Sequence, residues 1–213
     1  MRVERFQVGP LENNLYLLTT PGARDAIVVD PSIESEAVLE QIHARGLSVK
    51  RILLTHAHID HIQMVKPFHD RTGAPVWLHA DDRFLYDRGA GQAAEIGFSW
   101  PGTVPIDHWI VEGEEVGIPG IAVTAIQTPG HSPGSMTFAT EAGLIAGDVL
   151  FRGSVGRADL PGGDWPTLVR SVRERLFAYP PETAVYPGHG PLTTIGHEMK
   201  TNPFVGEHAF ERA

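Results

Sequence analysis

Thr55-His56-Ala57-His58-Ile59-Asp60-His61 places four potential metal ligands within six residues of one another. The segment directly follows the apolar run Arg51-Ile52-Leu53-Leu54, which is typical of a buried strand. Alternate side chains of an extended segment project to the same side, and a tight turn after them brings His61 round to join the others. The sequence therefore predicts that these four side chains converge at the end of this strand.

Three further residues of ligand type each follow a predicted strand in a turn that contains glycine: His131 within 128–132, Asp148 after 146–147, and His189 within 186–190. Several neutral imidazoles and a carboxylate able to bridge are what a pair of divalent cations requires. A lone histidine is ambiguous, but a cluster with three more ligands at strand ends has no packing rationale. We predict a two-metal site made of His56, His58, Asp60, His61, His131, Asp148 and His189.

Zinc is the expected metal at such a histidine-rich site, and the carboxylates make iron or manganese acceptable as well. Asp60 and Asp148 are also the candidate catalytic residues, as acceptors of a proton released by a metal-activated water. We interpret the remaining histidines as solvated or structural: His43, His69, His108, His197 and His208. His79, after a predicted strand, fits either a structural role, which we favour, or a position behind the metal ligands. Asp30 ends a predicted strand and fits equally well a turn residue or an acceptor that orients the histidine segment.

Composition narrows the functional classes. The 213 residues include no cysteine, which excludes disulfides, thiolate metal sites and a cysteine nucleophile. A net charge of -9 argues against nucleic acid or anionic lipid as a partner. No apolar run approaches the ~20 residues needed to cross a bilayer, and the N-terminus lacks the apolar core of a secretion signal, so we expect no membrane association and a cytoplasmic location.

Hydrophobic periodicity predicts two successive halves, each with strands followed by helices, and therefore one α/β domain over residues 1–213. Between the halves, glycines and prolines interrupt any period from 87 to 107, which predicts a long loop of the kind that often forms a lid. The expected strands are 3–8, 14–19, 26–29, 51–54, 75–78, one near 116, 121–128, 136–140, 143–146 and 183–186. The expected helices are 35–45, 62–72, 80–86, 164–177 and a short one after 193.

The order of motifs resembles the metallo-β-lactamase superfamily: Thr-His-x-His-x-Asp-His, then Gly-His-Ser-x-Gly, Gly-Asp and Pro-Gly-His-Gly. This resemblance implies a four-layer αββα sandwich with its metals at one sheet edge. It also implies that His56, His58 and His131 hold one metal and that Asp60, His61 and His189 hold the other, bridged by Asp148. Residues 151–162 and 188–204 are similar to the short bacterial glyoxalase II-like group, the hydroxyacylglutathione hydrolases.

That subgroup implies a small-molecule substrate, a hydroxyacyl-glutathione or related thioester, attacked by a hydroxide that the two cations generate near neutral pH. The long form of glyoxalase II carries a basic C-terminal region that binds the carboxylates of glutathione. In this sequence Lys200 is the only Lys or Arg between Arg175 and Arg212, so the resemblance leaves the thiol carrier open. The alternatives are an iron oxidoreductase of the persulfide dioxygenase type, which shares this fold, and a lactonase or β-lactamase using the same site.

Two hypotheses concern residues around the site. Arg157 either pairs with a substrate carboxylate or braces its own loop against Asp159, and we favour the brace. Phe98 and Trp100, in the long loop, are expected to line the acyl pocket.

Overall fold

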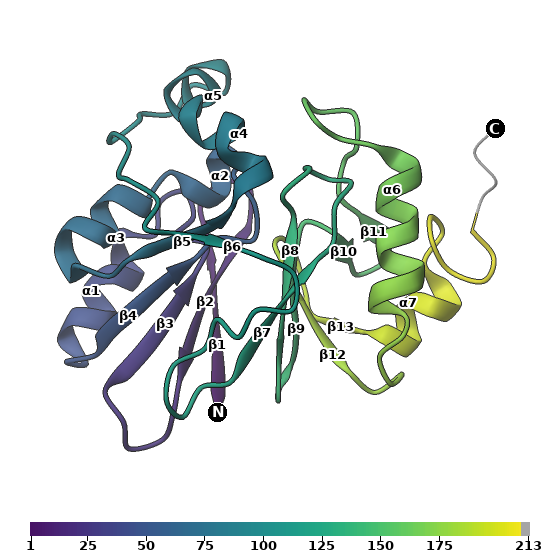
Figure 1. Ribbon diagram of the computed structural model, residues 1–213, viewed down its shortest axis with the longest axis horizontal. Coiled ribbons are helices and arrows are strands. Elements are labelled where there is room, and N and C mark those ends of the chain that lie inside the picture. The colour runs from purple at the N-terminus through teal and green to yellow at the C-terminus, as the bar shows by residue number, and fades with distance from the viewer. Residues whose placement is uncertain (210–213) are drawn as a thin grey trace.

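The computed structural model describes residues 1–209, in which two β-sheets lie face to face between outer layers of helices (Figure 1). The first sheet runs in the order β1 (Arg2–Val8), β2 (Asn13–Thr19), β3 (Asp25–Val29), β4 (Ser48–Leu53), β5 (Val76–His79) and β6 (His108–Ile110). The second runs in the order β13 (Thr193–Thr194), β12 (Ala184–Pro187), β9 (Gly143–Gly147), β8 (Met136–Thr140) and β7 (Val123–Gln127). A separate hairpin pairs β10 (Leu150–Phe151) with β11 (Ser154–Val155).

Both sheets are mixed. In the first, β1 to β3 pair antiparallel and β3 to β6 pair parallel. In the second, the only parallel pair among the described strands is β9 with β12. Parallel neighbours end at the same edge of a sheet, so β4, β9 and β12 deliver the residues that follow them to that edge.

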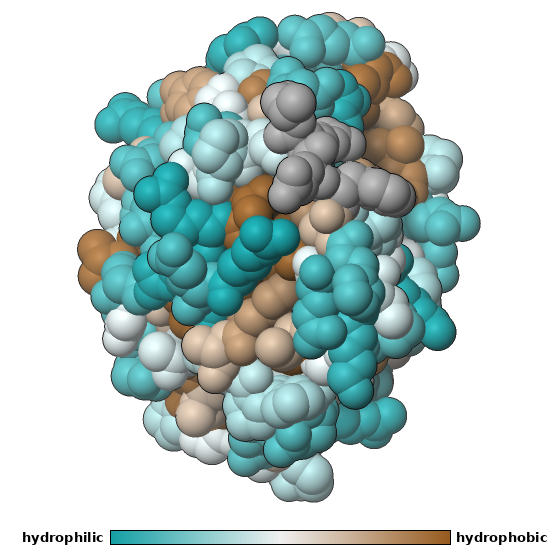
Figure 2. Space-filling view, turned by 90° about the vertical axis from the view of Figure 1, so that its right-hand side faces the viewer, coloured by the Kyte–Doolittle hydropathy of each residue, from teal (hydrophilic) through white to brown (hydrophobic). Residues whose placement is uncertain are grey.

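Helices cover the outer face of each sheet (Figure 1). Those on the first sheet's side are α1 (Glu36–Ala44), α2 (Ile59–Ile62), α3 (Val65–Thr72), the 3₁₀ helix η1 (Ala80–Asp82), α4 (Arg83–Asp87) and α5 (Gly89–Glu95). Those on the second sheet's side are α6 (Trp165–Arg170), its π-helical continuation η2 (Ser171–Leu176), and α7 (Ile195–Thr201). Figure 2 looks onto this second helical layer, where hydrophilic residues cover most of the surface.

Three separate apolar clusters fill the spaces between the four layers. Along β2, Leu15 and Leu17 point into the cluster under the first helical layer, whereas Tyr16 and Leu18 point between the sheets. Phe138 of β8 meets Tyr16 and Leu18 in that central cluster, and a third cluster lies under α6, η2 and α7. A strand that buries both faces loses the alternation of polar and apolar residues, which is why β2 is buried along its whole length. The predicted αββα sandwich is confirmed.

Local signals place several elements as expected. The Asp164 side chain accepts a hydrogen bond from the Thr167 backbone N–H and caps α6, and Thr194 caps α7 in the same way through His197. No helix among residues 1–209 is both long and apolar enough to cross a membrane.

The prediction of a long loop over 87–107 was wrong in its first part, because residues 89–95 form α5. Gly89 has a packing role there: a Cβ at this position would lie 2.5 Å from the Trp100 ring. The predicted helix 62–72 is divided at residues 63–64 into α2 and α3, and the expected strand near Val116 makes only an isolated bridge between Glu115 and Thr124.

Candidate metal centre

All seven predicted ligand residues meet at one edge of the sandwich. His56 and His58 follow β4, and α2 carries Asp60 and His61. The other three come from the second sheet, where His131 follows β7, Asp148 follows β9 and His189 follows β12. The edge is therefore built jointly by both halves of the chain.

Three histidines form the first group of converging atoms. The Nε2 atom of His131 lies 3.2 Å from His56 Nε2 and 2.8 Å from His58 Nδ1. All three rings are buried. Their ligand atoms fall within 4.8 Å of one another, which is the spacing expected around one cation.

A second group lies beside the first. His189 Nε2 is 3.1 Å from Asp60 Oδ2 and 3.2 Å from His61 Nε2. Asp148 stands between the groups: one carboxylate oxygen is 3.3 Å from His61 Nε2, and the other is 3.6 Å from His131 Nε2 and 3.4 Å from His189 Nε2. This carboxylate can therefore contact cations in both groups.

Hydrogen bonds on the outer side of four rings fix which nitrogen faces the cluster. The Nδ1 atoms of His131 and His189 donate to the backbone carbonyls of Arg157 and Leu11, at 2.6 and 2.8 Å. His61 Nδ1 donates to Asp30 at 3.0 Å. An Nδ1–H leaves Nε2 with its lone pair, so each of these rings presents an acceptor to the centre.

The fourth ring, His56, is fixed through Thr55. The Thr55 hydroxyl donates to Asp30 Oδ2 at 2.6 Å, so its oxygen is left to accept from His56 Nδ1 at 3.0 Å. Asp30 also accepts from the Thr55 backbone N–H at 2.7 Å. Asp30 is thus an orienting acceptor, one of the two alternatives left open by the sequence.

The pKa values divide four of the cluster's histidines into two pairs, His56 with His58 and His61 with His189. Burial lowers the pKa of His56, and it lowers that of His58 to about 3. For His61 and His189 burial acts in the same direction, but Asp148 and Asp60 outweigh it and raise both pKa values, that of His189 to about 10.

The two carboxylates show the opposite balance. Burial favours the neutral form of Asp60 and Asp148, yet the charge of His61 lowers the pKa of both below its ordinary value. The cluster therefore holds ionised carboxylates against cationic rings, an arrangement in which a proton and a metal cation compete for the same sites.

The donor set fits two cations. Acceptor atoms 2.8 to 3.2 Å apart with lone pairs aimed at one point repel one another unless a positive charge lies between them. His58 Nε2 is buried without a hydrogen-bond partner among residues 1–209, so no other side chain fixes that ring through this atom. No further histidine of the described residues belongs to these groups; His79 accepts a hydrogen bond from the Asp81 backbone N–H and caps η1.

Sequence reasoning missed Asn13. Its side-chain amide donates to Asp60 Oδ2 at 2.9 Å, and its backbone bridges to His189. Two adjacent asparagines, Asn13 and Asn14, in an otherwise apolar strand are a sequence signal for such a role, because fully buried amides need partners. Sequence reasoning also missed Asp82, whose buried carboxylate accepts from the Ala57 backbone N–H.

A cavity of about 450 Å³ opens over the cluster. Its walls are mainly apolar, and the polar lining residues outside the cluster are Arg88, Gln92, Glu95 and Arg157. The apolar lining residues are Leu11, Ile59, Leu85, Ile96, Phe151, Val155, Leu160 and Pro161.

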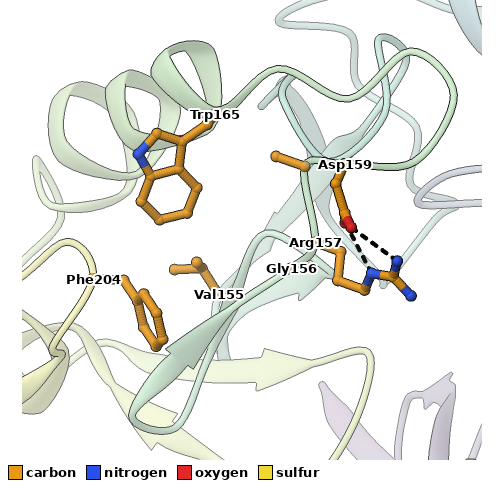
Figure 3. Close-up of a pocket in the computed structure, with 7 residues that line it drawn as sticks. Val155, Gly156, Arg157, Asp159, Trp165 and Phe204 are labelled. Atoms are coloured by element: carbon orange, nitrogen blue, oxygen red, sulfur yellow. Dashed lines mark hydrogen bonds and ion pairs between the residues drawn. The ribbon is translucent and has the colours of Figure 1, made fainter. Parts of the chain in front are cut away.

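The prediction that Phe98 and Trp100 line this cavity was wrong, since neither is among its lining residues and Trp100 packs against the core under the first helical layer. Arg157 pairs with Asp159 at 2.9 and 3.0 Å, in line with the bracing role. Figure 3 shows this pair on the rim of a second cavity of about 440 Å³, with Trp165 and Phe204 on the opposite side. Val155 and Arg157 line both cavities, so the loop 155–159 separates them.

Comparison with known proteins gives a family match over most of the chain. A model of the metallo-beta-lactamase superfamily matches residues 8–189. The probable metallo-hydrolase YqgX of Bacillus subtilis is 36% identical over 211 residues, covering 96% of this chain and 98% of that protein. Hydroxyacylglutathione hydrolase GloC of Haemophilus influenzae is 33% identical over 209 residues, with coverage of 96% and 98%.

Two solved structures are similar in fold and sequence. A B3 metallo-beta-lactamase, BLEG-1, has a TM-score of 0.89 at 38% identity, covering 96% of this chain and 99% of that one. TTHA1623 in a di-iron-bound form has a TM-score of 0.86 at 41% identity, with coverage of 95% and 100%.

Proposed function

Because the chain belongs to the metallo-β-lactamase superfamily and is a metallo-hydrolase, we propose that it cleaves a small-molecule thioester, of the hydroxyacylglutathione kind, at a two-cation centre. We assign His56, His58 and His131 to one cation and Asp60, His61 and His189 to the other, with Asp148 shared. Zinc suits this mixture of imidazole and carboxylate, and the similarity to a di-iron protein makes iron the alternative metal.

Two divalent cations held there supply Lewis acidity, which polarises a substrate carbonyl and makes an attacking water more acidic. The protein's own contribution is to hold the ligand rings in fixed orientations. Backbone carbonyls accept hydrogen bonds from His131 and His189, and the Asp30 carboxylate accepts one from His61. Asp60 and Asp148 are the carboxylates placed to accept a proton from the attacking water, and Asn13 restricts how Asp60 can turn.

The observation that carries the thioester proposal is the shortage of general acids in the cavity lining within residues 1–209, where the carboxyl groups besides Glu95 are Asp60 and Asp148, whose pKa values are lowered. An amide nitrogen needs a proton to depart, whereas a thiolate leaves without one. The ionisable lining residues outside the cluster are Arg88, Glu95 and Arg157, and Glu95 is paired with Arg88 at 3.2 Å. Arginine stays protonated and cannot act as a general acid at ordinary pH.

The apolar walls also suit the carbon skeleton of an acyl group. Both arginines of the cavity carry acidic partners, Glu95 for Arg88 and Asp159 for Arg157. An ion pair at the surface contributes only ~0.2–1 kcal/mol, so a substrate carboxylate can displace either partner at small cost. A carrier with carboxylates, such as glutathione, is therefore compatible with this rim.

The similarity to BLEG-1 makes β-lactam hydrolysis the second candidate. One comparison decides between them: hydrolysis of S-D-lactoylglutathione and of a chromogenic β-lactam by the same purified protein, with metal content measured in parallel. We expect two cations per chain, thioester cleavage that stops on chelation, and slow or no β-lactam cleavage.

The variant Asp148→Ala tests the shared carboxylate, and Asp87→Ala, an exposed acidic residue in α4, is its matched control. We expect the first to lose thioesterase activity and metal, and the second to keep both. Faster cleavage of the β-lactam than of the thioester would overturn the proposal, as would one iron per chain with oxygen uptake on a persulfide substrate.

A further inference from the structure

Asp82 is a fully buried carboxylate outside the seven cluster residues. It ends η1, the single 3₁₀ turn that follows β5. A carboxylate in the interior is costly unless donors surround it. Three donors do so here: Oδ2 accepts from the Ala57 backbone N–H at 3.0 Å and from the Ser132 hydroxyl at 2.7 Å, and Oδ1 accepts from the Gly134 backbone N–H at 2.7 Å.

Each of these donors belongs to a segment that carries histidines of the first group. Ala57 lies between His56 and His58, and Ser132 directly follows His131. The first segment belongs to the N-terminal half of the chain and the second to the C-terminal half. Asp82 therefore joins, through one side chain, the two loops that must meet around one cation.

The close approach is built into the backbone as well. A Cβ on Gly134 would lie 2.8 Å from both the carboxyl carbon and Oδ1 of Asp82, closer than real contacts allow. Glycine at 134 thus lets the loop of His131 reach Asp82 directly.

Asp30 is a second buried carboxylate behind the cluster. It accepts from the Thr55 backbone N–H, the Thr55 hydroxyl and His61 Nδ1. Asp30 touches a ligand ring directly, whereas the three hydrogen bonds of Asp82 within the described residues go to groups beside the rings. The centre thus has two buried carboxylates behind it: Asp30 acts on His56 through Thr55 and on His61, and Asp82 acts on the loops of His58 and His131.

We infer that Asp82 is a positioning residue for the His56, His58 and His131 group: it sets the distance between the two loops and thereby the affinity of that group for its cation. The inference rests on the proposed two-cation centre and not on the thioester activity. It can therefore be tested by metal binding alone, without substrate.

The test is a titration of the metal-free protein with Zn²⁺ and, for its visible absorption, with Co²⁺, comparing wild type with Asp82→Asn. Asparagine keeps the shape but turns one acceptor into an N–H₂ donor, which then faces either Ala57 N–H and the Ser132 hydroxyl or Gly134 N–H. Loss of such a partner behind a metal ligand typically costs about 10–100-fold in metal affinity. We expect that loss for one cation and a change of less than about threefold for the other, with a matching change in the Co²⁺ spectrum at one equivalent.

Asp81→Asn is the matched control, because it makes the same chemical change at the neighbouring residue, whose side chain is exposed. Ser132→Ala is a second variant, which removes one donor and keeps the carboxylate; we expect it to weaken the same cation by a smaller factor. It keeps the inference testable if Asp82→Asn does not fold.

The outcomes separate the two proposals. If wild type binds fewer than two cations, the proposed two-cation centre is itself contradicted. The inference is overturned if wild type binds two cations and Asp82→Asn binds both with unchanged affinity; if Asp82→Asn does not fold, Ser132→Ala takes its place in this comparison. In that case the proposed function still stands. A lower melting temperature without a change in metal affinity has the same meaning, because it assigns Asp82 to stability alone.

Discussion

Gly188→Ala should disable the metal centre, although Gly188 has no side chain and is not one of the ligand residues. A Cβ at this position would lie 2.0 Å from Asp148 Oδ1 and 2.8 Å from His61 Cε1. An ordinary contact begins near 3.4 Å, so the carboxylate has to retreat by 1.4 Å, the difference between 3.4 and 2.0 Å. Since Asp148 stands within 3.6 Å of three ligand nitrogens, such a shift removes it from at least one cation.

A misplacement of about 1 Å at a catalytic site can cost about 100-fold in rate, and we expect a loss of at least that size in kcat for thioester hydrolysis. The assay is steady-state hydrolysis at saturating metal and substrate, together with metal content after dialysis. Gly190→Ala is the comparison on the other side of His189: its Cβ meets nothing within 4 Å, but its φ of +69° strains an alanine, so ~1–2 kcal/mol of stability should be lost with little effect on rate. A Gly188→Ala protein within about twofold of wild-type kcat and metal content would refute the reasoning.

Two further predictions concern the core and the uptake of metal. Phe138→Ala removes a fully buried ring between the sheets and should lower the free energy of unfolding by ~3–5 kcal/mol, measured by urea denaturation; a loss below about 1 kcal/mol would contradict the packing described. Metal binding at pH 8 should release at least about two protons per chain, one from each of His61 and His189, because the pKa of His189 is about 10 and that of His61 is raised, whereas His56 and His58 are already neutral. A pH-stat titration measures this proton release, which should diminish as the pH rises through the pKa of His189. If no protons are released at pH 8, these rings are not cationic in the metal-free protein.

Much of the site could be predicted from the sequence because its ligands obey a local rule. Five of the seven lie in the loop after a strand, and strands that share a direction end at one edge. These five, together with Asp60 and His61 in the turn after β4, were enough to place the cluster. The alternation of Leu15, Tyr16, Leu17 and Leu18 is a weaker signal, since a strand buried on both faces has no polar side to reveal its orientation.

What sequence reasoning missed depends on contacts between distant segments. Asp82 is one acidic residue among several on the segment after β5, and its hydrogen bonds go to distant segments: to Ala57, 25 residues away, to Ser132, 50 residues away, and to Gly134, 52 residues away. The helix α5 was read as loop because Gly89 and Gly91 have poor helix propensity, whereas the packing of Trp100 over Gly89 makes glycine the residue that fits. For the same reason the sequence places Trp100 in the acyl pocket, whereas it packs against the core under the first helical layer.

The joint construction of the edge has a consequence for how the molecule holds together. Four ligand residues come from the first sheet's half and three from the second, so a cation shared among them is also a cross-link between the two halves. Its binding energy adds to the other contacts between the two halves, which include the apolar cluster around Tyr16 and Phe138 and the hydrogen bonds of Asp82. In a cell short of metal the protein would thus be inactive, and its two sheets would separate more readily. It would therefore be a better substrate for proteases.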